Sequence, residues 1–184
     1  MNTLDEKTVV IFTDGSTKPD PGIGGAGLVV QDPSRTQWLE LEFPMKGITT
    51  IIGSEFEGVR QGLKYVQENF KNKESRVVII SDCKFVVNSI LNKSNSETYN
   101  FPVAECQRIM KELGENDCPE LYWIKGHSGI PGNEKVDQVA KRARLQAELD
   151  QPELYRRPNK TSTFLNFQGL NPYFTEKWNR HWIN

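Results

Sequence analysis

The sequence has few cysteines and no long apolar run, and each shortage excludes a class of protein. Its three cysteines, Cys83, Cys106 and Cys118, form no Cys-x-x-Cys pair. This argues against a zinc knuckle or a disulfide framework and favours a reducing compartment. No apolar stretch approaches a membrane span, and residues 2–7 are polar rather than signal-like. We therefore expect an intracellular protein, in the cytoplasm or nucleus, that is neither secreted nor attached to a membrane.

The chain also lacks an excess of charge of either sign. Its 23 basic and 24 acidic residues give a formal net charge of −1. A nucleic-acid partner would therefore have to be held by a local surface or by another chain. With 184 residues, the protein can form one well-buried core with an appendage, but it is short for two full domains.

Hydrophobic periodicity predicts an α/β fold. Three strand-like runs come first, and helices then alternate with two more strands, which gives a five-stranded mixed sheet flanked by helices. The first helix is expected to begin with a capping box formed by Ser54 and Glu57. The predicted strands are 9–13, 26–31, 38–43, 76–81 and 121–125, and the predicted helices are 56–70, 85–91, 102–113 and 133–148.

The composition changes after Asp150, which predicts a domain over residues 1–150 and a C-terminal extension over 151–184. Five basic residues against two acidic ones make the extension mildly basic, with a net charge of +3. Phe174, Trp178 and Trp182 are spaced by four, so a helix would place them on one face. That face is expected either to pack on the domain or to bind a partner or nucleic acid.

Four acidic residues occupy positions where a carboxylate is hard to explain structurally: Asp14, Glu55, Asp82 and Asp137. Asp14 and Asp82 end apolar runs that read as buried strands, so the chain is expected to turn there at the carboxyl edge of the sheet, where ligands collect. Carboxylates gathered without cations repel one another by several kcal/mol. The expected companion is therefore a hard divalent ion such as Mg²⁺.

Helical geometry distinguishes Glu55 from its neighbour Glu57. At about 100° per residue, Glu57 falls opposite the apolar stripe that contains Phe56, Val59 and Leu63, whereas Glu55 flanks that stripe in the first turn. Glu55 is therefore expected at the sheet edge and Glu57 in water.

The segment 125–134 carries His127 among three glycines and a proline, ten residues before Asp137. Such composition favours unusual backbone angles and mobility. A lone histidine is more often structural, but one in a flexible loop beside a metal site suits proton transfer. We take the second interpretation.

Together these motifs resemble the type 1 ribonuclease H domain over about residues 7–148. The resemblance rests on Thr-Asp-Gly-Ser at 13–16, Ser-Glu at 54–55, Ser-Asp at 81–82, and the Lys-Gly-His-Ser-Gly-Ile-Pro-Gly-Asn-Glu segment that leads to Asp137. The sequences of the Glu55 motif and of the His127 loop are most similar to those in the ribonuclease H domains of non-LTR retroelement reverse transcriptases. Four motifs in the family's order are highly specific, whereas one alone would be weak.

The resemblance implies an endonuclease that hydrolyses the RNA strand of RNA/DNA hybrids with two Mg²⁺ ions, which Mn²⁺ can replace. The four carboxylates match the metal ligands, and His127 matches a histidine that aids proton transfer or product release. The expected substrate-binding residues are Gly15, Ser16, Thr49, Thr50, Lys84, Asn133 and Glu134. The chain would act as a monomer or as one domain of a larger reverse transcriptase polyprotein.

The sequence departs from the family in the parts that hold the substrate. Ile51 and Ile52 stand where many members have two asparagines, and the segment between Asp82 and His127 is too short for a basic protrusion. Two alternatives therefore remain beside the ribonuclease. One is a non-catalytic connector or protein-interaction module with the same fold, and the other is a different nuclease or transposase of the superfamily.

Overall fold

The computed structural model describes residues 8–155 apart from 72, 74 and 93–96. Phe174, Trp178 and Trp182 lie outside the described residues, and so does the expected helix that contains them. The elements are β1 (Val9–Lys18), β2 (Gly22–Gln31), β3 (Leu39–Thr49), α1 (Ile51–Asn69), β4 (Val77–Ser81), α2 (Lys84–Ile90), α3 (Asn100–Asp117), β5 (Glu120–Trp123), α4 (Pro131–Asp150) and α5 (Pro152–Tyr155).

The five strands form one mixed sheet in the order β3-β2-β1-β4-β5. The first three strands are a meander, in which β1 pairs with β2 and β2 with β3 in antiparallel fashion. The last two strands run parallel to β1, because β4 pairs with β1 and β5 with β4. Helices connect these parallel strands, as parallel crossovers require. The predicted five-stranded mixed sheet is confirmed.

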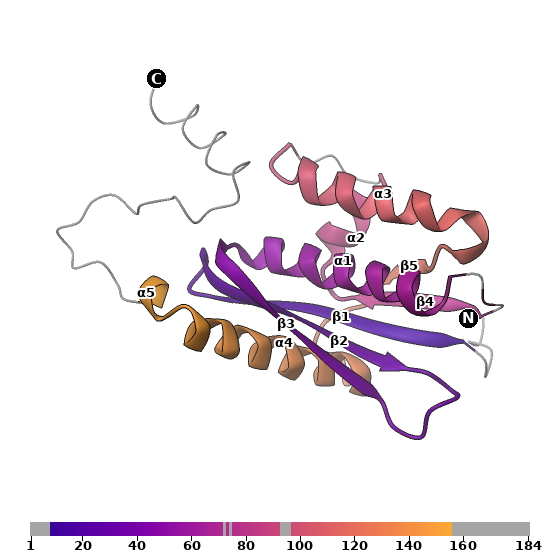
Figure 1. Ribbon diagram of the computed structural model, residues 1–184, viewed down its shortest axis with the longest axis horizontal. Helices are drawn as coiled ribbons and strands as arrows, with labels where there is room; N and C mark the ends of the chain where they lie inside the picture. Colours follow the sequence, from indigo (N-terminus) through magenta and orange to yellow (C-terminus); the bar gives the residue numbers. More distant parts are fainter. Residues whose placement is uncertain (1–7, 72, 74, 93–96, 156–184) are drawn as a thin grey trace.

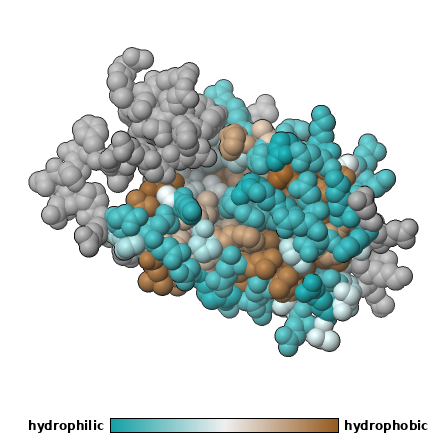
Figure 2. Space-filling model, viewed as in Figure 1, coloured by the Kyte–Doolittle hydropathy of each residue, from teal (hydrophilic) through white to brown (hydrophobic). Residues whose placement is uncertain are grey.

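Helices cover both faces of the sheet (Figure 1). The helix α1 packs on one face with α2 and α3, and its buried residues Phe56, Val59 and Leu63 belong to the larger core. On the other face, α4 places Val136 and Val139 against β1 and β2. In the same view, hydrophilic residues cover most of the described surface, and hydrophobic residues reach it in smaller areas between them (Figure 2).

Glycines in β1 and β2 let the helices approach the sheet closely. A Cβ on Gly15 would lie 2.3 Å from the backbone N of Glu55, so only glycine fits between β1 and the start of α1. On the opposite face, a Cβ on Gly27 would lie 2.7 Å from the backbone N of Ala140 in α4. These contacts fix the depth at which both helices lie over the middle of the sheet.

The end of α4 is tied to the edge strand β3 by Gln151. Its Oε1 accepts a hydrogen bond from the Gly47 backbone N–H at 2.6 Å, and its Nε2 donates to the Met45 carbonyl at 2.7 Å. One side chain therefore satisfies two backbone groups of a strand that has no partner on its outer side.

The structure corrects the predicted start of α1. The helix begins at Ile51, and Thr50 is its N-cap, accepting a hydrogen bond from the Gly53 N–H at 3.0 Å. Asp20, in the β1–β2 turn, accepts a further hydrogen bond from the Ile51 N–H. The expected capping box was wrong, since Ser54 lies inside the first turn. Its hydroxyl donates to the Ile51 carbonyl.

Strand β1 is also longer than predicted. It continues five residues past Thr13 and pairs with β2 as far as Lys18, so the chain does not turn at Asp14. What ends there is the parallel pairing with β4, whose last partners are Thr13 and Ser81. Within the described part of the chain, no helix is long and apolar enough to cross a membrane.

Candidate active site

The parallel pair β1 and β4 brings two of the acidic residues to the same edge of the sheet. Asp14 and Asp82 each directly follow the last paired residues, Thr13 and Ser81. The third, Glu55, comes from the first turns of α1, which Gly15 allows to lie against β1. The site therefore depends on two neighbouring strands and one closely packed helix.

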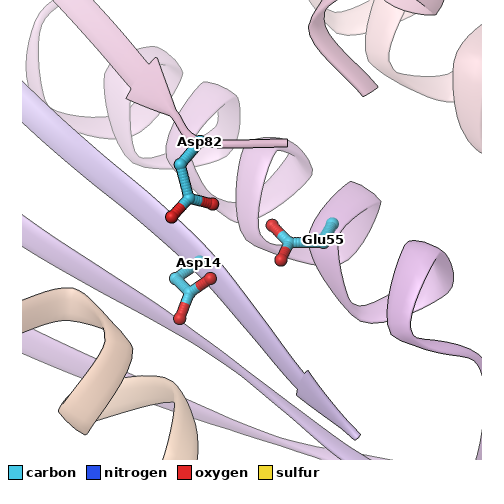
Figure 3. A group of neighbouring side chains, drawn as sticks. All are labelled: Asp14, Glu55 and Asp82. Atoms are coloured by element: carbon cyan, nitrogen blue, oxygen red, sulfur yellow. The ribbon is translucent and has the colours of Figure 1, made fainter. Parts of the chain in front are cut away.

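Asp14, Glu55 and Asp82 converge on one point (Figure 3). One ligand atom from each carboxylate lies within 4.8 Å of the other two. This confirms the helical phase inferred for Glu55. Glu57 faces away from this group, and its carboxylate pairs with Arg60 at 2.6 Å and accepts from Gln61 at 2.7 Å. Glu57 is partly buried by these contacts rather than fully in water.

Burial and mutual repulsion make these carboxyls weaker acids. Burial, together with the charge of Asp82, raises the pKa of Asp14 from its ordinary value to about 7, against the opposing effect of a hydrogen bond with Glu55. Burial raises the pKa of Glu55 well above its ordinary range, and the charges of Asp14 and Asp82 raise it further. The ionised cluster is thus unfavourable without a cation to balance it.

The polar groups of the cluster fit a hard divalent cation. The Oε2 atom of Glu55 is buried and has no hydrogen-bond partner. The amide of Asn133 donates to Asp82 Oδ2 at 3.0 Å, while its own Oδ1 is buried without a partner. Buried oxygens without donors are costly unless something satisfies them. Carboxylate and amide oxygens are also the ligands that Mg²⁺ prefers.

Asp137 lies near this group but outside it. Its charge contributes to the raised pKa of Asp14, although less than burial and Asp82 do. Its Oδ2 accepts a hydrogen bond from Lys141, one turn further along α4, at 2.6 Å. The structure therefore unites three of the four predicted metal ligands and places the fourth beside them with a cationic partner.

The loop before α4 holds His127 exposed at the edge of the site. His127 has a φ of 51° and Gly129 a φ of 77°, so the loop has the unusual backbone angles expected from its composition. A Cβ on Gly126 would lie 2.8 Å from Asp82 Oδ2, which places the loop backbone against the carboxylate cluster. Glu134 is exposed in the first turn of α4.

Besides Asn133 and Glu134 of α4, the predicted substrate-binding residues lie in β1, at the junction of β3 with α1, and at the start of α2. Ser16 follows Gly15 along β1, and Thr17 beyond it bonds to Ser54 of α1 at 3.1 Å. Thr50 is already engaged, because its hydroxyl caps α1 and forms a hydrogen bond with the Tyr99 hydroxyl at 3.0 Å. Thr49 donates to the Thr50 carbonyl at 3.4 Å.

Lys84 lies at the first turn of α2, with its Nζ 5.1 Å from the centre of the Trp123 ring. Sequence reasoning overlooked Trp123. The signal available was an aromatic residue at the end of a strand, immediately before the glycine and histidine loop.

A mixed sheet in this order, with carboxylates gathered where its parallel strands end, defines a hydrolase of the ribonuclease H type. Comparison with known families agrees. The RNase H family matches residues 6–144, and the chain belongs to that family.

Similar proteins include two bacterial ribonucleases. Ribonuclease HI of Neisseria meningitidis serogroup B is 29% identical over 150 residues, which cover 76% of this chain and 97% of the relative. Ribonuclease HI of Haemophilus ducreyi is 31% identical over 144 residues, covering 73% of this chain and 89% of the relative. The chain is thus an enzyme of the ribonuclease H class.

Solved structures share the fold. The crystal structure of LC11-RNase H1 in complex with an RNA/DNA hybrid matches with a TM-score of 0.63 and 22% identity, over 76% of this chain and 98% of that one. RNase H1 from the halophilic archaeon Halobacterium salinarum matches with a TM-score of 0.61 and 17% identity, over 76% and 99%. These likenesses concern the fold alone.

Proposed function

We propose that this protein is a metal-dependent endonuclease that hydrolyses the RNA strand of RNA/DNA hybrids. The observation that carries the proposal is the convergence of Asp14, Glu55 and Asp82 at the edge of an RNase H sheet. In the proposal these three residues and Asp137 hold two Mg²⁺ ions, for which Mn²⁺ can substitute. When bound, the ions supply activation of the attacking water and neutralisation of charge on the scissile phosphate.

The remaining residues of the site have roles that follow from their positions. His127 is exposed on its loop, so its imidazole can carry a proton between the reaction centre and solvent. Asn133 holds Asp82 by its amide and keeps that carboxylate directed into the cluster. Glu134, one residue further, is exposed at the same end of α4 and is assigned to shaping the site for the phosphate.

The proposed partner is an RNA/DNA hybrid, recognised by duplex shape and by the 2′-hydroxyls that distinguish RNA from DNA. A hybrid is bound to the structural neighbour LC11-RNase H1, which supports this choice. Gly15 and Ser16 follow Asp14 in β1, and Thr49 and Thr50 directly precede α1, which carries Glu55. Lys84 is the first residue of α2, two positions after Asp82. Thr50 would have to exchange or share the hydrogen bonds it makes at the helix cap.

The proposal also places this activity in a domain of a retroelement reverse transcriptase or in a cellular relative of one. Support for the retroelement context comes from the amino-acid sequences of the His127 loop and of the Glu55 motif. The relatives described above are bacterial ribonucleases and do not add to it. The mass of the endogenous protein tests it, because a polyprotein would far exceed 21.0 kDa.

A matched pair of variants tests the catalytic proposal. Glu55→Gln removes a negative charge from the cluster. Glu57→Gln removes a negative charge two residues further along α1, where the carboxylate pairs with Arg60 and lies outside the cluster. Cleavage of a labelled hybrid in magnesium is expected to fall by more than a hundredfold in the first variant and to stay near the parent rate in the second. An RNA duplex and a DNA duplex serve as substrate controls.

Two results would count against this function. A parent protein that binds the hybrid but leaves it intact in Mg²⁺ and in Mn²⁺ would favour the non-catalytic connector. Equal losses in the Glu55→Gln and Glu57→Gln variants would show that the activity does not depend on the cluster.

A further inference from the structure

Trp123 connects the two residues that flank Cys83 at the edge of the candidate site. It is the last residue of β5, the outermost strand on that side, and 41% of its surface is exposed. Its indole N–H donates a hydrogen bond to the backbone carbonyl of Asp82 at 2.9 Å. Its ring lies under the ammonium group of Lys84, whose Nζ is 5.1 Å from the ring centre.

The residues on either side of Asp82 have other hydrogen bonds, since the Ser81 carbonyl accepts from the Ile124 N–H at 3.1 Å and the Cys83 carbonyl accepts from the Val87 N–H at 3.2 Å. Between β4 and α2, the backbone N–H of Cys83 donates to the Ser81 hydroxyl at 3.1 Å. Cys83 is the N-cap of α2, but its side chain makes no capping hydrogen bond. Asp82 itself is held at both ends, because the Asn133 amide donates to its carboxylate and the Trp123 indole donates to its backbone carbonyl.

The ammonium group of Lys84 is available to bind an anion from outside the protein. It is exposed, and among the described residues it forms no salt bridge with an acidic side chain. Its contact with the indole restricts a flexible side chain to one region beside Asp82. An ammonium group held next to a carboxylate cluster can bind a phosphate of the nucleic-acid backbone there.

The neighbouring Tyr122 provides an internal comparison. Successive side chains of a strand point to opposite faces, and Tyr122 pairs with Glu120 on the other face of β5 rather than with Asp82 or Lys84. It is an exposed aromatic residue on the same strand, with 47% of its surface accessible. Removing its hydroxyl changes an aromatic residue of similar exposure without touching the site.

We infer that Trp123 is a positioning residue with two separable actions. Its N–H fixes the Asp82 backbone so that the carboxylate meets Asp14 and Glu55, and its ring holds Lys84 where the ammonium binds a backbone phosphate of the hybrid. The inference rests on the proposed function. It adds a residue that touches neither metal nor substrate and acts through two others.

Trp123→Phe isolates the hydrogen bond, because phenylalanine keeps a ring under Lys84 but has no donor. With saturating hybrid, the cleavage rate is expected to fall by roughly three- to tenfold, as for the loss of one hydrogen bond. The magnesium concentration for half-maximal rate should rise, while the KM for hybrid stays within about twofold of the parent. Tyr122→Phe is expected to match the parent in all three quantities.

A double-mutant cycle isolates the ring. Lys84→Met in the parent is expected to raise the KM for hybrid and to flatten the slope of log affinity against log salt by about 0.7 to 0.9, as for one lost phosphate contact. In a Trp123→Ala background the same change should have a markedly smaller effect, because the ammonium is no longer held there. Equal effects in the two backgrounds would overturn the second action.

Binding of magnesium alone, measured by calorimetry, distinguishes this inference from the proposed function. Weaker magnesium binding in Trp123→Phe than in Tyr122→Phe, with unchanged circular dichroism and Tm, supports the first action even if the parent cleaves nothing. Magnesium binding and rate equal to the parent in Trp123→Phe would overturn it, even if the parent proves to be an active ribonuclease.

Discussion

Asp14 is expected to destabilise the metal-free protein at neutral and alkaline pH, so Asp14→Asn should make it more stable there. Burial and the neighbouring Asp82 raise the pKa of this carboxyl from 3.8 to about 7 in the folded state. Ionising it in the folded protein therefore costs more than in the unfolded chain. At 1.4 kcal/mol per pH unit the difference is about 4 kcal/mol once the group is fully ionised.

The pH range follows from the direction of the shift. Because the folded state binds the Asp14 proton more tightly than the unfolded chain does, its stabilising contribution is complete below about pH 4. That contribution is lost as the pH rises through about 7. The parent in chelator should therefore lose about 3 kcal/mol of stability from pH 5 to pH 9 relative to Asp14→Asn, because part of the contribution is already lost at pH 5.

Urea unfolding in chelator, followed by circular dichroism at pH 5 and pH 9, measures this effect. Asp150→Asn, which removes an exposed carboxylate at the end of α4, is the control and should leave the pH dependence unchanged. Saturating magnesium should reverse the order, because ligand binding stabilises the parent and Asp14→Asn binds it weakly. If the variant is no more stable than the parent at pH 9 in chelator, this electrostatic reasoning is refuted.

Two further predictions concern the packing and the loop. Gly15→Ala places a Cβ 2.3 Å from the α1 backbone, so it should lower the free energy of unfolding by roughly 3 kcal/mol or more and weaken magnesium binding through Glu55. The control Ser16→Ala, one residue further along β1, should unfold near the urea midpoint of the parent. If Gly15→Ala also unfolded at the parent's midpoint, the close approach of α1 to β1 would not be important for stability. His127→Ala should slow single-turnover cleavage by roughly ten- to a thousandfold, as for a lost proton-transfer group. Its magnesium midpoint should not change, and a large change there would instead identify the imidazole as part of the metal site.

The sequence predicted the sheet and the position of Glu55 because both depend on strong periodic signals. The β-branched runs that became β1 and β4 are buried on both faces, and the stripe through Phe56 and Val59 sets the phase of α1. With that phase, Glu55 and Glu57 could be assigned to different surroundings from angles alone. The convergence of Asp14 and Asp82 followed from the rule that parallel strands end at the same edge.

Other features depend on contacts between distant segments, which local patterns do not encode. The start of α1 is set by Thr50 and by Asp20 from the β1–β2 turn, 31 positions earlier in the chain. The meander carries β1 past Asp14 because β2 supplies pairing partners as far as Lys18. The pairing of Asp137 with Lys141 and the bond from Trp123 to Asp82 likewise required coordinates.

The hydrogen bonds of Gln151 determine where the protein can be divided. A boundary drawn at residue 150 from composition would remove the side chain that bonds to Gly47 and Met45 of β3. Loss of stability on cutting there would then be attributed to the extension, although it arises from an edge strand left with two unsatisfied backbone groups. A chain cut after residue 155 keeps these hydrogen bonds of Gln151, so the contribution of the residues beyond is then measured without disturbing β3.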